Sequence, residues 1–114
     1  MRWLSPSEEH FLALLAEALY NNWEDAAFDM SDFCNHVSAS KSQLYRKCVN
    51  ATGISPNNLL REFRLSQALQ KLGNSNQNIS QVAFETGFNN PSYFTKCFYK
   101  KFGIKPSDFV NMHL

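Results

Sequence analysis

Two stretches of this chain repeat one another, and this repeat constrains the fold more than any other feature. At an offset of fifty residues, VSASKSQLYRKCVNATGISPNNLL (37–60) matches GFNNPSYFTKCFYKKFGIKPSDFV (87–110). Upstream, DFCNHV (32–37) matches QVAFET (81–86) at an offset of forty-nine, so the turn of the second copy is one residue longer. Each copy therefore predicts a short helix, a tight turn and a longer helix, followed by Gly-Ile-x-Pro.

Helix start signals recur along the chain and predict seven helices. Ser5-Pro6-Ser7-Glu8 and Ser40-Lys41-Ser42-Gln43 are capping-box patterns, and Asp29 and Asn78 are polar caps before further helices. Proline at the first helical position marks the starts at Ser55-Pro56, Asn90-Pro91 and Lys105-Pro106. The helix from Ser55 is expected to run to about Leu72, where Gly73-Asn74-Ser75-Asn76 stops it. No stretch alternates as a strand would, so the predicted class is all-α: two helix-turn-helix subdomains joined by a long linker helix.

The length of 114 residues suits one domain, or two very small subdomains that share one core. The expected divisions are a lead-in with an acidic first helix (1–29), a first helix-turn-helix (30–54), a linker helix (55–73) and a second helix-turn-helix with a closing helix (78–114). Together they are expected to act as one binding unit. Because the lead-in resembles a connection from something upstream, the chain is expected to be a fragment of a larger protein, with a small stand-alone protein as the alternative.

Composition excludes several classes of protein. No apolar run approaches the ~18 residues that span a membrane, and the N-terminus lacks the features of a signal peptide. Three cysteines without a CxxC pair fit a reducing cytoplasm, and three scattered histidines predict no metal site and no cofactor. Paired carboxylates, a nucleophile with its base and a phosphate loop are all missing, so an enzyme is not expected.

Charge is unevenly distributed although the net charge is only +1. Residues 1–29 contain one basic and six acidic residues, a net charge of −5, whereas residues 30–114 contain ten basic and four acidic residues, a net charge of +6. A basic remainder behind an acidic first segment keeps a polyanionic partner possible.

The longer helix of each copy has an apolar face and a polar face. At ~100° per residue, Phe94, Phe98 and Phe102 share one side with Cys97. The opposite side and its flanks carry Ser92, Thr95, Lys96, Tyr99 and Lys100. In the first copy Leu44 and Cys48 point inward, Ser42 and Arg46 point outward, and Tyr45 lies to one side. Hydroxyl and basic side chains at equivalent outward positions suit a helix in the DNA major groove, while the alternative is a solvated face.

The linker helix supplies a spacing between the two longer helices. Eighteen residues at 1.5 Å per residue give ~27 Å. With the flanking turns, this length is expected to set two recognition helices about one DNA turn, ~34 Å, apart. One chain would then contact two successive major grooves.

With these motifs laid out, residues 10–110 resemble the DNA-binding domain of the AraC/XylS family of bacterial transcription regulators. The resemblance is strongest in ISQVAFETGFNNPSYFTKCFYKKFGIKPSDF (79–109), and residues 38–72 look like the first motif and linker helix of that family. The acidic opening helix and the LYRK…GISP segment are most similar to the C-terminal domains of hybrid two-component sensor-regulators. Three residues depart from the family pattern: Ser38 where Gly is frequent, Cys48 where Phe is usual, and Pro91 where a polar residue is frequent.

The resemblance implies site residues by position. Base-facing candidates are Ser42, Tyr45 and Arg46 in the first copy and Ser92, Thr95 and Lys96 in the second; phosphate candidates are Lys41, Asn90 and Lys100. Arg61 and Arg64 match a basic pair of the family and are expected to be structural, pairing with carboxylates such as Glu62 or with carbonyls.

The resemblance also implies partners and a location. The partners are double-stranded DNA, RNA polymerase and a second copy through an upstream module, with no small-molecule site in this chain. The location is cytoplasmic, with a parent protein that is either free or anchored in the inner membrane. The competing hypothesis is a helical protein-interaction module that keeps the fold without specific DNA binding, which Pro91 and the low net charge favour.

Overall fold

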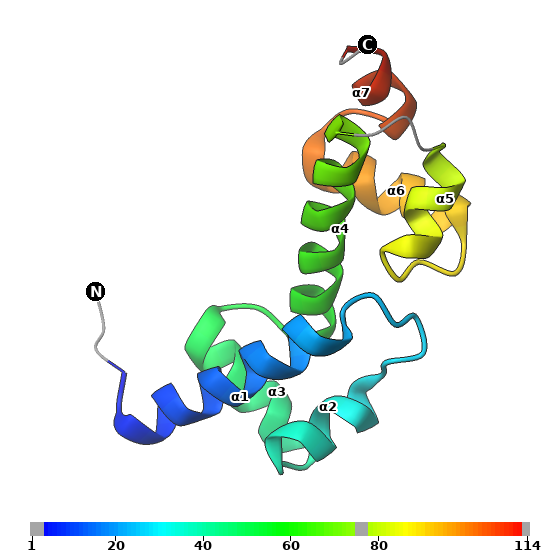
Figure 1. Cartoon of the computed structure of the whole chain (residues 1–114). Helices are drawn as coiled ribbons and strands as arrows, with labels where there is room; N and C mark the ends of the chain where they lie inside the picture. The colour runs from blue at the N-terminus through cyan, green and yellow to red at the C-terminus, as the bar shows by residue number, and fades with distance from the viewer. Residues whose placement is uncertain (1–3, 75–77, 113–114) are drawn as a thin grey trace. The chain divides into compact units, whose positions relative to one another are not determined.

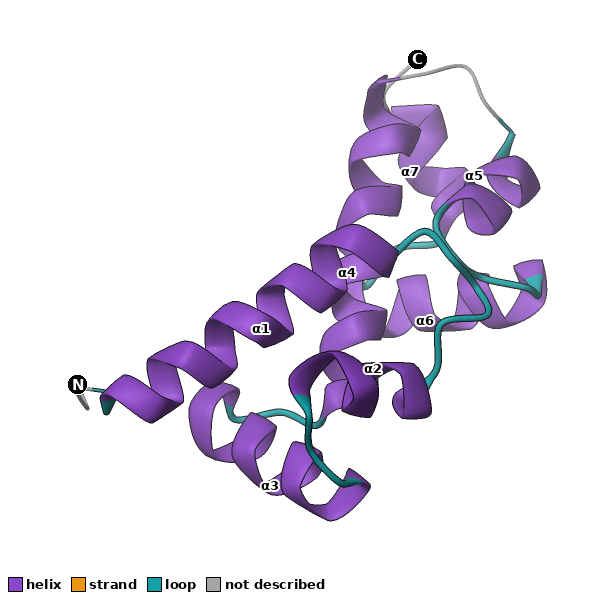
Figure 2. Ribbon diagram, turned by 60° about the horizontal axis from the view of Figure 1, so that its bottom comes forward, coloured by secondary structure: helices purple, strands orange, loops and turns teal. Residues whose placement is uncertain are grey.

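The computed structural model describes residues 4–74 and 78–112, and within these ranges it contains seven α-helices and no strand (Figures 1 and 2). The helices are α1 (Pro6–Asn22), α2 (Met30–Val37), α3 (Lys41–Thr52), α4 (Pro56–Asn74), α5 (Ile79–Glu85), α6 (Pro91–Phe102) and α7 (Pro106–Met112). The predicted all-α class and the predicted helix starts are confirmed. Residues 75 and 76 of the Gly73–Asn76 stop signal lie outside the described residues.

Capping boxes fix the starts of three helices. In the box before α3, the Gln43 amide donates to Ser40 Oγ at 3.2 Å, and the Ser40 amide donates to Gln43 Oε1 at 3.0 Å. Ser5 closes the same box before α1. Asp29 closes one with Asp32 before α2, and the hydrogen bond from the Asp32 amide lowers the pKa of the Asp29 carboxyl. These reciprocal bonds satisfy amides that would otherwise lack partners at each helix start.

Helix α4 continues beyond the expected stop at Leu72 and includes Gly73 and Asn74. A glycine ends a helix when it takes up a left-handed conformation, as Gly53 and Gly103 do with φ of 83° and 75°. Gly73 has no such positive φ, so it remains part of the helix. Helix α4 thus extends to Asn74, two residues beyond the expected end at about Leu72.

Contacts group the chain into two units. Unit 1 consists of Met1–Trp23 and Phe28–Leu60, and unit 2 consists of Glu24–Ala27 and Arg61–Leu114. Unit 1 thus contains α1, α2, α3 and the start of α4, while the rest of α4 belongs to unit 2 with α5, α6 and α7. Within unit 2, Arg64 Nη2 donates to the carbonyl oxygen of Asp25 at 2.8 Å, which ties residues 24–27 to α4.

The core of unit 1 is built from the packing of α1, α2 and α3 against one another (Figure 1). Its buried apolar side chains are Phe11, Leu15, Ala18, Leu19, Phe28, Phe33, Val37, Leu44, Cys48 and Leu60. Phe28, in the loop before α2, packs edge-on against Phe33 with ring centroids 5.0 Å apart. The loop is therefore anchored in the same core as the helices.

The core of unit 2 is a chain of aromatic rings that runs along α6. Phe94 packs edge-on against Phe88 at 5.1 Å between centroids, and Phe98 lies 5.7 Å from Phe94 and 4.7 Å from Phe102. These rings pack with Leu65, Ala68, Leu72, Val82 and Ala83. The inward face of α6 is thus fixed against α4 and α5.

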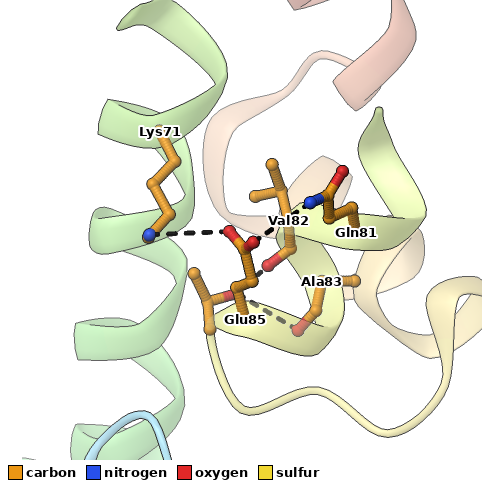
Figure 3. Close-up of polar contacts among 6 residues, drawn as sticks. Lys71, Gln81, Val82, Ala83 and Glu85 are labelled. Atoms are coloured by element: carbon orange, nitrogen blue, oxygen red, sulfur yellow. Dashed lines mark hydrogen bonds and ion pairs between the residues drawn. The ribbon is translucent and has the colours of Figure 1, made fainter. Parts of the chain in front are cut away.

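Polar contacts hold α5 in place within unit 2 (Figure 3). Lys71 Nζ of α4 lies 3.6 Å from Glu85 Oε2, and Gln81 Nε2 donates to Glu85 Oε1 at 3.3 Å. At the end of α5, the buried Thr86 hydroxyl donates to the Val82 carbonyl oxygen at 2.7 Å. The turn that leads to α6 therefore starts from a fixed helix end.

Candidate nucleic-acid interface

Each unit contains a helix-turn-helix built on the same local conformation. In unit 1, α2 ends at Ser38, which has a left-handed backbone with φ of 54°, and the Ala39 amide then donates to the Cys34 carbonyl oxygen at 3.1 Å. In unit 2, α5 ends before Gly87, which has φ of 90°, and the Phe88 amide donates to the Ala83 carbonyl oxygen at 2.9 Å. Each turn ends the first helix of its pair, and α3 or α6 follows as the second helix.

Helix α3 has the two faces predicted from its sequence. Leu44 and Cys48 are 1% and 0% exposed, whereas Ser42, Arg46 and Tyr45 are exposed. Lys41, at the first position of α3, is exposed as well. The outward positions of residues 42 and 46, one turn apart, are therefore confirmed, and their contacts with DNA remain a prediction.

Helix α6 has matching faces. Phe94 and Phe98 are 0% exposed, and the exposed positions include Ser92, Lys96, Tyr99 and Lys100. Thr95 and Cys97 are half-buried, so Thr95 offers less surface than the other base-facing candidates. The structure brings the α6 candidates together within unit 2 and the α3 candidates together within unit 1.

The basic residues next to these candidates have partners inside their own units. Lys47, which follows Arg46, lies 5.7 Å from the centroid of the Phe11 ring. Lys101, which follows Lys100, pairs with Glu62 of α4 at 3.8 Å. Lys47 and Lys101 therefore have the same charge as the candidates Arg46 and Lys96, and each has a contact within its own unit. They serve as matched controls for Arg46 and Lys96.

Side-chain caps use some of the backbone amide groups at the starts of α3 and α6. Asn90 Oδ1 accepts hydrogen bonds from the amides of Ser92 at 2.8 Å and Tyr93 at 3.1 Å. The side-chain carbonyl of Asn90 is therefore used as the cap of α6, and its amide nitrogen is the group that would donate to a phosphate. In α3 the Gln43 amide is used in the same way by Ser40.

The two arginines of α4 bond within unit 2. Arg64 donates to the Asp25 carbonyl oxygen, and burial lowers the pKa of its guanidinium while the charge of Asp25 opposes the shift. Arg61 Nη1 donates to the phenol oxygen of Tyr93 at 3.0 Å. Glu62 pairs with Lys101. Arg64 thus contacts a backbone carbonyl, one of the two kinds of partner expected, and Arg61 contacts a phenol, which was not among them.

Sequence reasoning did not single out Tyr93, which is 48% exposed in the first turn of α6. The helical position of Tyr93, 100° from Phe94, places it at the edge of the apolar face, and this signal alone indicates partial exposure. Its partner Arg61 lies thirty-two residues away in the chain, so the contact leaves no local pattern.

Within residues 4–74 and 78–112, no helix combines the length and apolarity needed to cross a membrane. The same described residues contain no group of three or more His, Cys, Asp or Glu side chains placed to hold a metal ion.

Comparison with known proteins identifies the family. A family model described as "Helix-turn-helix domain" matches residues 33–112. "Histidine kinase P4" of Formosa agariphila is 34% identical over 96% of this chain, and the "HTH-type transcriptional activator RhaR" of Cronobacter sakazakii is 34% identical over 89% of it. The matches span 8% and 35% of those two relatives.

A solved structure shares the fold. The DNA-binding domain of AdpA, a global transcriptional factor in complex with a target DNA, superposes with a TM-score of 0.82 at 24% identity, covering 90% of each chain. The family match covers residues 33–112, which include most of α2 and all of α3 to α7. This chain belongs to the AraC-type helix-turn-helix family of DNA-binding transcription regulators.

Proposed function

We propose that this chain binds double-stranded DNA at a specific sequence, with α3 and α6 as the two recognition helices in successive major grooves. The observation that carries the proposal is the shared design of these helices. Each buries an apolar residue, Leu44 or Phe94, and exposes a serine and a basic residue at equivalent outward positions. Such side chains donate to base edges in the major groove.

The proposed contacts follow from the exposed faces. Ser42, Tyr45 and Arg46 on α3 read bases in one groove, and the corresponding residues on α6 are Ser92, Thr95 and Lys96. Phosphate contacts come from Lys41, Asn90 and Lys100. The proposal treats residues 30–54 and 78–114 as the two reading modules of one DNA-binding unit, with residues 55–73 as the linker helix and residues 1–29 as the lead-in.

The proposed role is that of the output domain of a larger bacterial two-component regulator. The support is the similarity to a histidine kinase of which this chain matches only 8%, together with the similarity to a transcriptional activator. In this role the domain works in the cytoplasm, on a free or membrane-anchored parent, and acts on RNA polymerase. A homodimer through an upstream module is part of the same proposal.

The first test is a selection of this chain against random duplex DNA, followed by titrations at two salt concentrations. Enrichment of two short motifs about ten base pairs apart is the expected result. The affinity should fall steeply with salt, because each neutralised phosphate releases counterions. Absence of binding even at low salt would overturn the proposal for this chain.

One observation favours a second candidate, a protein-interaction module. Phe84 on α5 is 54% exposed, and an exposed aromatic side chain is a frequent anchor in protein interfaces. Lys96→Ala separates the two candidates, with Lys101→Ala as the control on the same helix. Loss of specific binding with Lys96→Ala alone supports DNA reading. If Phe84→Ala abolishes capture of a partner while Lys96→Ala has no effect, the interaction module is the better description.

A further inference from the structure

The contact between Arg61 and Tyr93 joins the helix that precedes the second helix-turn-helix to the first turn of its recognition helix. Arg61 Nη1 of α4 donates to the Tyr93 phenol oxygen at 3.0 Å, and both residues belong to unit 2. Tyr93 is 48% exposed, so its ring is neither a core residue nor a free surface side chain. The hydrogen bond from Arg61 therefore fixes the orientation of a partly exposed phenol.

Three contacts fix the Tyr93 side chain and its backbone. The Tyr93 amide donates to Asn90 Oδ1 at 3.1 Å, which sets the backbone of the first helical turn. The ring centroid lies 6.3 Å from that of the buried Phe88. The guanidinium of Arg61 holds the far end of the ring. Because the backbone amide, the ring and the hydroxyl of Tyr93 each have a contact, its side chain loses little conformational entropy when it binds a ligand.

The chemistry of the phenol determines what it offers. A tyrosine hydroxyl has one proton to donate and an oxygen that accepts, whereas a guanidinium only donates. In the contact with Arg61 the Tyr93 oxygen is therefore the acceptor, and its proton is directed toward another group. An oriented donor beside a positive charge is suited to an anionic acceptor.

The position of Tyr93 on α6 indicates which anion it meets. Tyr93 and the phosphate candidate Lys100 are spaced i and i+7, so they lie on one flank of the helix, and both are exposed. Ser92 and Lys96 lie on the side of this flank that carries the base-facing candidates. Two donors along the flank of a recognition helix suit a phosphate backbone, which presents acceptors at regular intervals.

We infer that Tyr93 donates a hydrogen bond to a DNA phosphate and that Arg61 is a positioning residue that orients the phenol for it. The inference rests on the proposed function, since it assumes that α6 lies in a major groove. It assigns Arg61 an indirect role: the guanidinium acts on DNA through Tyr93 and makes no phosphate contact of its own.

The test is a double-mutant cycle with Tyr93→Phe, Arg61→Met and the double variant. The operator obtained from the selection and an unrelated duplex are the two probes. Tyr93→Phe should weaken binding to both by about tenfold, the equivalent of one charge-assisted hydrogen bond. Arg61→Met should give a similar loss, and the double variant should be no weaker than either single variant, because both remove the same contact.

The salt dependence separates an indirect from a direct role of Arg61. A neutral phenol releases no counterion, so Tyr93→Phe and Arg61→Met should both leave the slope of log Kd against log salt unchanged. A direct phosphate contact of Arg61 would instead reduce the slope by about one in Arg61→Met and would overturn the inference. Arg61→Lys, which keeps a donor, should recover part of the affinity.

Two controls keep the outcome interpretable. Tyr20→Phe removes the hydroxyl of an exposed tyrosine on α1 and should leave the affinity unchanged. Tyr93→Phe deletes one oxygen only, so it tests the phenol contact even if Arg61→Met disturbs the packing of α4. Unchanged affinity in Tyr93→Phe overturns the inference, whereas a wild-type chain that binds no DNA overturns the proposed function itself.

Discussion

Ser38 and Gly87 occupy equivalent turn positions in the two helix-turn-helix units, and both have a left-handed backbone, with φ of 54° and 90°. Glycine adopts this conformation freely, whereas a residue with a Cβ atom is strained in it by about 1–2 kcal/mol. Unit 1 therefore carries strain in its turn that unit 2 avoids.

The first prediction concerns this difference. Ser38→Gly should stabilise the chain by about 0.5–1 kcal/mol, because relief of the strain exceeds the extra backbone entropy of glycine in the unfolded state. Gly87→Ser, the reverse exchange in unit 2, should destabilise by about 1–2 kcal/mol. Urea unfolding of both variants checks the pair. A loss of stability in Ser38→Gly would show that the serine side chain makes a compensating contribution.

Arg46→Ala should weaken binding to the selected DNA and relax the preference at one base position, with a cost of about 1–3 kcal/mol. Its neighbour Lys47 provides the matched control, since the Lys47 ammonium lies over the Phe11 ring, 5.7 Å from its centroid. Lys47→Ala should change affinity much less and leave the base preference intact. Competition binding with single-base variants of the site measures both effects, and equal losses for the two variants would contradict the assignment.

Cys48 makes the stability of the chain depend on pH in the alkaline range. Burial raises the pKa of its thiol, a shift that its contact with the Thr52 hydroxyl opposes. The folded state then keeps the proton that the unfolded state loses above about pH 8.5, so this contribution to stability is complete below that pH and declines as the pH rises.

The slope of the free energy of unfolding against pH tests this prediction. The free energy of unfolding should fall above about pH 8.5 by up to ~1.4 kcal/mol per pH unit from this group. Cys48→Ala should lower stability at pH 7 through the lost packing and should also reduce the slope. Parallel pH profiles of the wild type and Cys48→Ala would mean that the thiol does not titrate differently in the two states.

Gly73→Ala should stabilise helix α4 by about 0.5 kcal/mol, since Gly73 is helical and alanine favours the helix. A Cβ atom at this position would lie 3.9 Å from two carbon atoms of the Phe109 ring, which is an ordinary packing distance. Thermal unfolding is the measurement, and Gly53→Ala is the contrast. Gly53 has φ of 83°, so alanine there should destabilise although space is free around it.

The features that the sequence predicted are those with local causes. The helix starts were predictable because Ser5, Ser40 and Asn90 lie within three residues of the amides they cap. The outward position of Arg46 and Lys96 followed from helical periodicity alone. A local sequence pattern does not show the backbone angle of a glycine, so the expectation that Gly73 ends the helix at about Leu72 missed the last two residues of α4.

The contacts that were missed join distant parts of the chain. Arg64 reaches a carbonyl thirty-nine residues away, and Arg61 reaches a phenol thirty-two residues away. Neither partner could be identified from the sequence, because every residue has a backbone carbonyl and the contact between Arg61 and Tyr93 leaves no local pattern. The structural role of the two arginines was predictable, but the atoms they bind were not.

The bond from Arg64 to the Asp25 carbonyl has a consequence for how such domains can be recombined. Residues 24–27 belong to unit 2, although the sequence on both sides of them belongs to unit 1. A chimera that takes residues 61–114 from this chain and all earlier residues from a relative would therefore place a foreign loop against Arg64. An exchange of unit 2, which contains α6, must therefore transfer residues 24–27 together with residues 61–114, and a single junction in α4 transfers only the second of these segments.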